Sequence, residues 1–595
     1  MIAKVAVGLE IRKSFDYEAK GHTHLKKGMR VEVDFNRRKT LGFVVDIKKK
    51  SSSPFTLKPI IKVLDTLPAF PSNLLKLSEE ISQQYLYSQG EILKMMLPAG
   101  LRTHRQLAVG AGAAPSKRRK PAAPKTTYIQ ENIENAGRLL YYRDRIREVL
   151  SSGGKVIVCL PGISDAFRFK DFFIRHLPGA KIAFFSGAQS PSAQLSDWTA
   201  MRLKEADICI GTRSSIFAPF EDVGLIIVEK ENYYGYFQPV KPFYHLRDLA
   251  FLRAKKEKAD LILHSDFPSL KLYTLIKDKK IDLLDLSVKG DPRLKVFDLK
   301  NYRFKRYAVF SDFAQEIMRR YLAQDKKVII FWNRKGFSRI LRCQHCGFAL
   351  KPPQGGAEKE AKARCPECRK GSLRTIGAGI ERLESRFKKP FGSKKIVKLS
   401  KDHRIESDDW DILIATQKLV FLPELPKAAL VIVSGLDLMY SNKDYNASLE
   451  LFLLLQRLKR VAAEELILFT FDPESQPVQS LDKDWQWFYE RELKARRSLQ
   501  FPPYVHIAKV GLRQKDKAAA LKNITAFRSS LEKNLYTKDA LAVYGPLEDD
   551  PFKSGGRYHF FLFIKAKRAA PLRKILDKTI RQFRKSSAKM SLVIN

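Results

Sequence analysis

The stretch that decides the fold spans residues 206–238 and reads ADICIGTRSSIFAPFEDVGLIIVEKENYYGYFQ. It contains two short apolar runs, at 208–210 and 224–228. Uninterrupted apolar runs of this length are typical of strands that are buried on both faces of a parallel sheet. Ligands of such sheets bind beyond the carboxyl ends of the strands. We therefore expect the turn at 211–214 and the charged patch at 229–232 to meet at one functional edge.

The composition points to a polyanionic partner. The chain has 595 residues, with 109 Lys and Arg against 64 Asp and Glu, which gives a formal net charge of +45. An excess of this size is typical of proteins that bind nucleic acid, although a generally Lys-rich protein is the alternative. No apolar run approaches the ~20 residues that a membrane span needs. Charged residues from Lys4 to Lys13 also interrupt the opening apolar stretch, so we expect no signal peptide.

Four of the six cysteines form two CxxC pairs, which residues 347–364 separate. This spacing can bring four thiolates to one tetrahedral Zn²⁺. Unbound or disulfide-bonded cysteines are the alternative, which fits a large intracellular protein poorly. The sequence therefore predicts one structural zinc site, with the ligands Cys343, Cys346, Cys365 and Cys368.

Several segments resemble the replication-restart helicase family PriA. In that family a GTRSALFAP-like segment precedes a strand and a D-E-E-H box, and this chain has GTRSSIFAP at 211–219 and EKEN at 229–232. The words LEIRKSFDY, GMRVEVDF and LKPIIKVLD resemble the family's domain for the 3′ end of DNA, and LQFPPYVHIAKVGL resembles its C-terminal domain. The resemblance covers most of the chain.

The resemblance implies an α/β multidomain protein. We expect a mostly β 3′-DNA-end-binding domain at 1–102, a basic flexible linker at 103–135, and a RecA-like parallel α/β lobe at 136–295. A second RecA-like lobe is expected at 296–340 and 375–497, with a zinc-ribbon-like insertion at 341–374. An α+β DNA-binding domain is expected at 498–595, in which the basic stretch 565–589 has a helix-like pattern. The chain has no room for the family's winged-helix domain, and it keeps four of the eight cysteines usual in the insertion.

The resemblance also suggests residues that bind a DNA end. The family's contacts to the terminal nucleotide correspond to Asp16, Tyr17 and Lys58. A carboxylate can accept a hydrogen bond from a free 3′-hydroxyl, an aromatic ring can stack on a base, and a Lys can hold a phosphate. The alternative is that Tyr17 belongs to the core of its strand and Asp16 to a turn.

The ATP-binding motifs look altered. The family's phosphate loop, G-x-x-x-x-G-K-[ST], aligns with NIENAGRL at 132–139, which keeps Gly137 but has Arg138 in place of Lys and Leu139 in place of the hydroxyl residue. In the acidic box only Glu229 and Glu231 remain as carboxylates. We therefore expect weak or no binding of ATP and Mg²⁺, and we assign no catalytic residue.

These observations predict a bacterial, cytoplasmic DNA-binding protein of replication restart or repair, which recognises forked or gapped DNA and has weak or no ATPase activity. Two alternatives stay open. The protein could be an active ATP-dependent 3′→5′ helicase that uses Arg138 on the phosphates, or a non-enzymatic scaffold of the primosome. Other replication-restart proteins and single-strand-binding proteins are the candidate partners that the resemblance implies.

Overall fold

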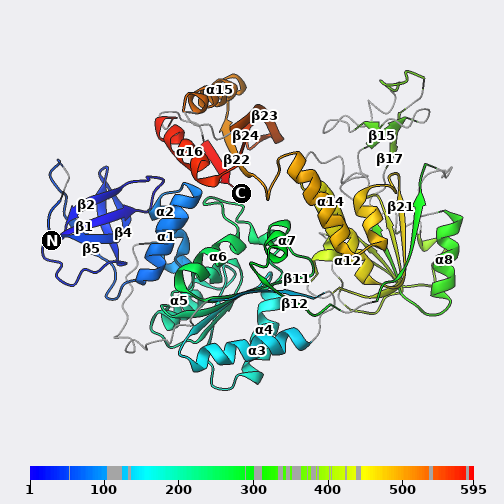
Figure 1. The fold of residues 1–595 in the computed structure, drawn as a ribbon, viewed down its shortest axis with the longest axis horizontal. Helices are drawn as coiled ribbons and strands as arrows, with labels where there is room; N and C mark the ends of the chain where they lie inside the picture. The colour runs from blue at the N-terminus through cyan, green and yellow to red at the C-terminus, as the bar shows by residue number, and fades with distance from the viewer. Residues whose placement is uncertain are drawn as a thin grey trace. The chain divides into compact units, whose positions relative to one another are not determined.

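The structure is a computed structural model in which the chain forms two compact units, residues 1–287 with 496–595, and residues 288–495. Figure 1 shows the ribbon of the chain. The structure describes residues 1–51, 54–103, 124–131, 136–287, 290–300, 311–332, 340–343, 349–350, 364–370, 373–376, 384, 387–400, 403, 405, 407–422, 425–436, 444–534, 541–583 and 589–594.

The N-terminal part of the first unit is a small antiparallel sheet with the strand order β2-β1-β4-β3-β5. A parallel bridge between Glu18 and Pro59 links the two edges, so the sheet curls into a barrel. Ser88 caps α2 through a capping box with Glu91, which satisfies two N–H groups that have no partner within the helix. The elements are β1 (Ile2–Val7), β2 (Ser14–Glu18), β3 (Arg30–Phe35), β4 (Arg38–Lys48), β5 (Ile60–Val63), α1 (Ser72–Tyr85) and α2 (Gln89–Met96).

A seven-stranded parallel sheet forms the larger part of this unit, in the order β12-β6-β11-β10-β7-β9-β8. All six residues of β10 are buried, because Leu225 and Ile227 pack in the same apolar cluster as α3 and α4 while Ile226 and Val228 pack with α5, α6 and α7. The prediction of a strand buried on both faces is therefore confirmed. The strands are β6 (Thr126–Gln130), β7 (Lys155–Cys159), β8 (Ile182–Phe185), β9 (Ile208–Gly211), β10 (Val223–Val228), β11 (Asp260–Ser265) and β12 (Asp282–Asp285). The helices are α3 (Ala136–Ser151), α4 (Ile163–His176), α5 (Pro191–Arg202), α6 (Leu246–Glu257) and α7 (Leu270–Lys277).

The second unit contains a six-stranded parallel sheet in the order β13-β21-β20-β14-β19-β18, with apolar clusters on both faces. A separate three-stranded sheet, β16-β15-β17, spans residues 340–376 and so extends slightly beyond the zinc insertion expected at 341–374. The strands of the large sheet are β13 (Arg293–Asp298), β14 (Val328–Trp332), β18 (Ile396–Leu399), β19 (Ile412–Ala415), β20 (Ala428–Ser434) and β21 (Ala462–Thr470). The helices include α8 (Asp312–Leu322), α12 (Ala447–Val461) and α14 (Trp485–Ser498), and the small sheet consists of β15 (Ile340–Cys343), β16 (Ala349–Leu350) and β17 (Leu373–Ile376).

The C-terminal part of the first unit is an antiparallel sheet with two helices, in the strand order β23-β24-β22-β25. Its elements in chain order are β22 (His506–Gln514), α15 (Lys517–Lys533), β23 (Leu541–Ser554), β24 (Arg557–Ala566), α16 (Ala569–Phe583) and β25 (Lys589–Ile594). The predicted fold class is thus confirmed: a mostly β N-terminal domain, two parallel α/β sheets and an α+β C-terminal domain.

Three sequence expectations need correction. The sequence placed the boundary between the two parallel lobes at 295/296, but β13 pairs with β21 in the second sheet and the second unit begins at residue 288. The first parallel sheet already includes β6, although the sequence assigned 103–135 to the linker. Five residues after a Pro-, Ala- and Lys-rich stretch are too few to show a periodicity, so this strand is defined only by its partners β11 and β12. The basic stretch 565–589 is not one helix, because residue 565 lies in β24, α16 covers only 569–583, and residue 589 begins β25.

Candidate functional site

An ion-pair cluster surrounds Arg138, near the end of the segment 132–139 that the sequence assigned to the phosphate loop; residues 132–135 lie outside the described residues. Arg138 lies in the first turn of α3, and only 2% of its side chain is exposed. Its guanidinium forms an ion pair with Glu131, lies 3.0 Å from Glu229 Oε1 through Nη2, and lies 3.2 Å from His264 Nε2 through Nη1. Tyr142 donates a hydrogen bond of 2.9 Å to Glu229 Oε2. Arg138 therefore points into the sheet edge and contacts residues that end three neighbouring strands.

The charge state of Glu229 depends on the cationic groups around it. Burial acts to raise the pKa of the Glu229 carboxyl, but the charges of Arg138 and Lys230 and the contact with His264 together outweigh burial and hold that pKa well below its usual range. Burial lowers the pKa of His264, against the attraction of Glu229. At neutral pH the cluster thus holds the buried carboxylate of Glu229 in its charged form, balanced by the guanidinium of the same chain.

Two further residues of the charged box, Glu231 and Asn232, also bind groups of the chain itself. Glu231 is fully buried, accepts a hydrogen bond of 3.0 Å from Arg247 Nη1, and accepts one of 2.6 Å from the backbone N–H of Ser269. The amide of Asn232 donates to the carbonyl of Phe267 at 2.9 Å. Both carboxylates that could hold a metal ion in this box are therefore engaged by cations or N–H groups of the protein.

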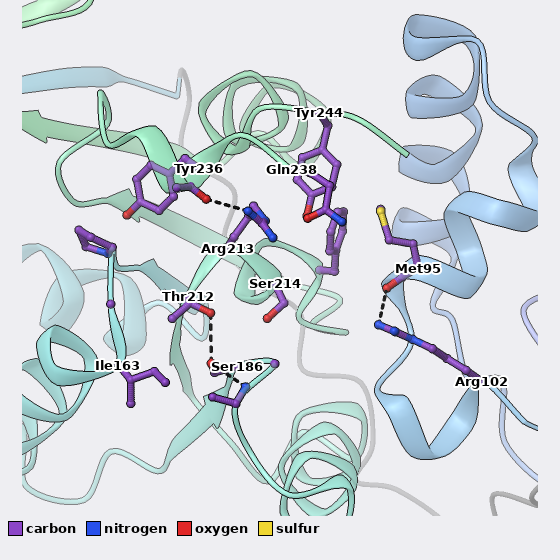
Figure 2. Close-up of a pocket in the computed structure, with 16 residues that line it drawn as sticks. Met95, Arg102, Ile163, Ser186, Thr212, Arg213, Ser214, Tyr236, Gln238 and Tyr244 are labelled. Atoms are coloured by element: carbon purple, nitrogen blue, oxygen red, sulfur yellow. Dashed lines mark hydrogen bonds between the residues drawn. The ribbon is translucent and has the colours of Figure 1, made fainter. Parts of the chain in front are cut away.

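A cavity of about 530 Å³ opens at the same edge, beside the turn 211–214 that the sequence singled out. Figure 2 shows Thr212, Arg213 and Ser214 on one wall and Arg102 on the opposite wall, pointing towards the cavity. Arg213 is anchored by hydrogen bonds from Nη1 to the carbonyls of Gly235 (2.7 Å) and Phe237 (3.0 Å). Two guanidinium groups and several hydroxyl groups around a cleft form an arrangement that suits phosphate oxygens.

The three residues expected at the DNA end lie in the N-terminal barrel. Asp16 accepts a hydrogen bond of 2.6 Å from Ser51 Oγ, and Lys58 Nζ lies 2.8 Å from Asp34 Oδ2. The hydrogen bond from Lys58 lowers the pKa of Asp34. Only 4% of Tyr17 is exposed, its hydroxyl donates to the carbonyl of Asp34, and burial raises its pKa to about 12. The ring of Tyr17 thus packs in the barrel core, as the alternative expected, and a role of Asp16 and Lys58 at a DNA end stays a prediction.

The expected zinc ligands are described only in part. Cys346 and the side chain of Cys343 lie outside the described residues, Cys365 is buried, and Cys368 is half-buried. The register of the small sheet pairs Cys343 with Leu373, which follows the second CxxC pair closely in the sequence. This register places residue 343 beside the strand that follows the second CxxC pair, and the zinc site itself stays a prediction.

Sequence reasoning missed three contributors to these sites. Glu131 follows β6 and was assigned to the linker, Arg102 was assigned to the last position of the N-terminal domain, and no role was assigned to His264. The available signal was the strand pattern: residues that end neighbouring parallel strands meet at one edge, whatever their distance in the sequence. Nothing in the sequence around Arg102 indicated the cavity.

The fold and the sites together define a multidomain α/β protein, with two parallel sheets and charged residues gathered at a strand-end edge of the first. The family model "3'DNA-binding domain (3'BD)" of PriA matches residues 4–98, and "Primosomal protein N C-terminal domain" matches residues 497–595. The chain is therefore a PriA-like protein.

Curated relatives extend this similarity over most of the chain, and those described here are named replication restart protein PriA. The protein of Bacillus subtilis is 24% identical over 593 residues, which cover 92% of this chain and 71% of the relative. That of Rickettsia conorii is 26% identical and covers 97% and 96%, and that of Haemophilus influenzae is 24% identical and covers 98% and 97%. These relatives are bacterial. Separately, none of the helices in the described ranges has both the length and the apolar character that crossing a membrane requires.

Proposed function

We propose that this protein binds forked or gapped DNA with a free 3′ end during replication restart, and that it hydrolyses ATP poorly or not at all. The DNA part is supported by the matched 3′ DNA-binding domain, by the net charge of +45, and by the arginine-lined cavity beside the turn 211–214. Arg102 and Arg213 would hold the phosphates of a strand that passes this edge, while Asp16 and Lys58 would contact the 3′-terminal nucleotide.

The observation that carries the loss of ATPase activity is the inward position of Arg138. Its guanidinium pairs with Glu131 and Glu229, so it occupies the place where a phosphate-loop cation would face a nucleotide. Phosphoryl transfer in RecA-like lobes depends on positioning and on charge neutralisation by Mg²⁺. The side chain of Leu139 cannot bind Mg²⁺, and the carboxylates of Glu229 and Glu231 are already paired. The residues present therefore do not fit a Mg²⁺–nucleotide site.

An ATPase assay on the full chain tests this proposal. We expect turnover far below ~1 s⁻¹ both without DNA and with forked DNA, because losses of electrostatic groups cost a factor of about 10²–10³ each. Calorimetry with a non-hydrolysable ATP analogue and Mg²⁺ should give no measurable binding. DNA-stimulated turnover of ~1 s⁻¹ or more would support the alternative of an active helicase.

Fork binding tests the DNA part and separates it from a scaffold role. Asp16→Ala should weaken binding to forks that end in a free 3′-hydroxyl by about 1.5–3 kcal/mol, the range for hydrogen bonds to charged groups, and should leave binding to 3′-blocked forks nearly unchanged. Lys62→Ala, an exposed charge change on β5, is the matched control and should affect both forks equally. Equal losses for Asp16→Ala on both forks would show that Asp16 serves only the fold, and no fork binding by the natural protein would favour the scaffold.

A further inference from the structure

The C-terminal domain has the chain order β-α-β-β-α-β, and the first and third of its strands, β22 and β24, lie in the middle of the sheet. Both helices cover the same face. Alternate residues of β22 and β24, such as Val510 and Leu562, pack with α15 and α16 in one apolar cluster. RNA-recognition motifs are also four-stranded sheets with an uncovered face, on which aromatic side chains stack two or three bases.

The face away from the helices is rich in aromatic side chains. Phe561 and Phe563 on β24 alternate with the buried core positions and are half-buried. Tyr544 lies opposite Phe563 on β23 and Leu547 opposite Phe561, and these two are 48% and 44% exposed. Directly opposite residues of antiparallel strands project from the same face of the sheet, so these four side chains form one apolar surface, which we term the aromatic face.

Lysines accompany this surface. Lys509, opposite Phe563 on β22, has its Nζ 4.2 Å from the ring centre of Phe561 and 2.7 Å from Asp549 Oδ1. Lys565 has its Nζ 3.8 Å from the ring centre of Phe501 and 5.7 Å from that of Tyr544. An aromatic ring with an ammonium group beside it can bind a base through the ring and the phosphate of the same nucleotide through the ammonium group. An apolar protein partner would have no group to pair with these lysines.

We propose that the aromatic face binds single-stranded DNA by base stacking on Phe561, Phe563 and Tyr544, with Lys509 and Lys565 beside the phosphates. In duplex DNA the bases are already stacked on one another and are not accessible to aromatic side chains. The aromatic face should therefore bind single-stranded DNA more tightly than duplex DNA. The surplus of cations on the chain favours a polyanion over a protein partner. This proposal rests on the proposed DNA-binding function and adds to it a second, end-independent contact.

The test uses the full chain and a covalently closed circle of about 30 thymidines, a length that spans the site of one single-strand-binding fold. The circle has no 3′ end, so the N-terminal domain cannot contribute its end-specific contact. Phe563→Leu and Phe561→Leu keep an apolar side chain and remove the ring, and each should weaken binding about tenfold, as expected for loss of one stacked base. Phe563→Tyr keeps the ring and should retain the natural affinity.

Three controls isolate stacking from folding and charge. Tyr544→Ser changes an exposed side chain and should weaken binding without lowering the melting temperature, whereas Leu521→Ala, an exposed change on α15, should leave binding unchanged. The natural protein should bind an abasic circle of the same length more weakly than the thymidine circle. On the abasic circle, Phe561→Leu and Phe563→Leu should have the same affinity as the natural protein.

The outcomes separate this proposal from the proposed function. Natural affinity of Phe561→Leu, Phe563→Leu and Tyr544→Ser for the thymidine circle, with the preference for free 3′ ends intact, would overturn the aromatic-face proposal alone. Failure of the natural protein to bind forks and circles alike would overturn the proposed function itself.

Discussion

At the scale of single residues, Arg138 is the one whose replacement should cost most. It balances the buried carboxylates of Glu131 and Glu229, and removing one partner of a buried ion pair typically costs about 3–5 kcal/mol. We therefore expect Arg138→Ala to lower the free energy of unfolding of the first unit by about this amount, measured by urea denaturation. As a control on the same helix, Arg143→Ala removes a surface ion pair with Asp144. This variant should change the free energy of unfolding by at most about 1 kcal/mol.

The pH dependence of the Arg138→Ala variant follows from the same contacts. In the natural protein the pKa of Glu229 lies well below its unfolded value, so its contribution is present at neutral pH and is lost as the pH falls through the folded value. Without Arg138, the largest charge that opposes the effect of burial is gone, so we expect the pKa of Glu229 to rise. The deficit of the variant should then grow as the pH rises from the acid range towards neutral pH, because the natural protein stabilises the charged carboxylate more than the variant does. If Arg138→Ala is as stable as the natural protein at every pH, Arg138 is not held by these carboxylates. That outcome would support the alternative in which Arg138 binds the phosphates of ATP.

At the scale of elements, the insertion around β15, β16 and β17 is too small to bury a core of its own. Segments below about 40 residues usually need a metal or disulfides to fold. We expect one zinc ion per chain by elemental analysis, and we expect Cys365→Ser to lose it and to make the insertion sensitive to protease while the two parallel sheets melt as before. Cys209→Ala, a change in the buried strand β9, should keep the zinc. Zero or two zinc ions per chain would contradict the prediction.

At the scale of the whole molecule, the net charge of +45 should govern how tightly any DNA is bound. Each Lys or Arg that contacts a phosphate releases counterions, so the logarithm of the binding constant should fall linearly with the logarithm of the salt concentration. If about six or more phosphates are contacted, affinity should drop about 10³-fold or more between 50 and 200 mM salt. Fluorescence anisotropy on duplex DNA without ends measures this slope. An affinity that is independent of salt would mean that the charge serves solubility and not DNA binding.

The sequence by itself determined the fold class and the identity of the buried strands. The run 223–228 is apolar at every position, and only a strand covered on both faces buries all of it, as β10 is. The paired CxxC motifs and the 3′-end words were equally local signals, which need no knowledge of distant residues. The changes in the phosphate loop and the acidic box relative to the resembled family were read in the same way, and their effect on ATP hydrolysis stays a prediction.

Only the tertiary structure decided where side chains point. That Arg138 turns inward depends on Glu131, Glu229 and His264, which reach it from three strands that are neighbours in space and distant in the sequence. The run YHFFLFIKA in β24 is apolar on both sides of the strand, so its period of two could not tell the core from the aromatic face. The helices α15 and α16 decide this, because they pack against Leu562 and Ile564. Phe561 and Phe563 are left on the opposite face of the sheet.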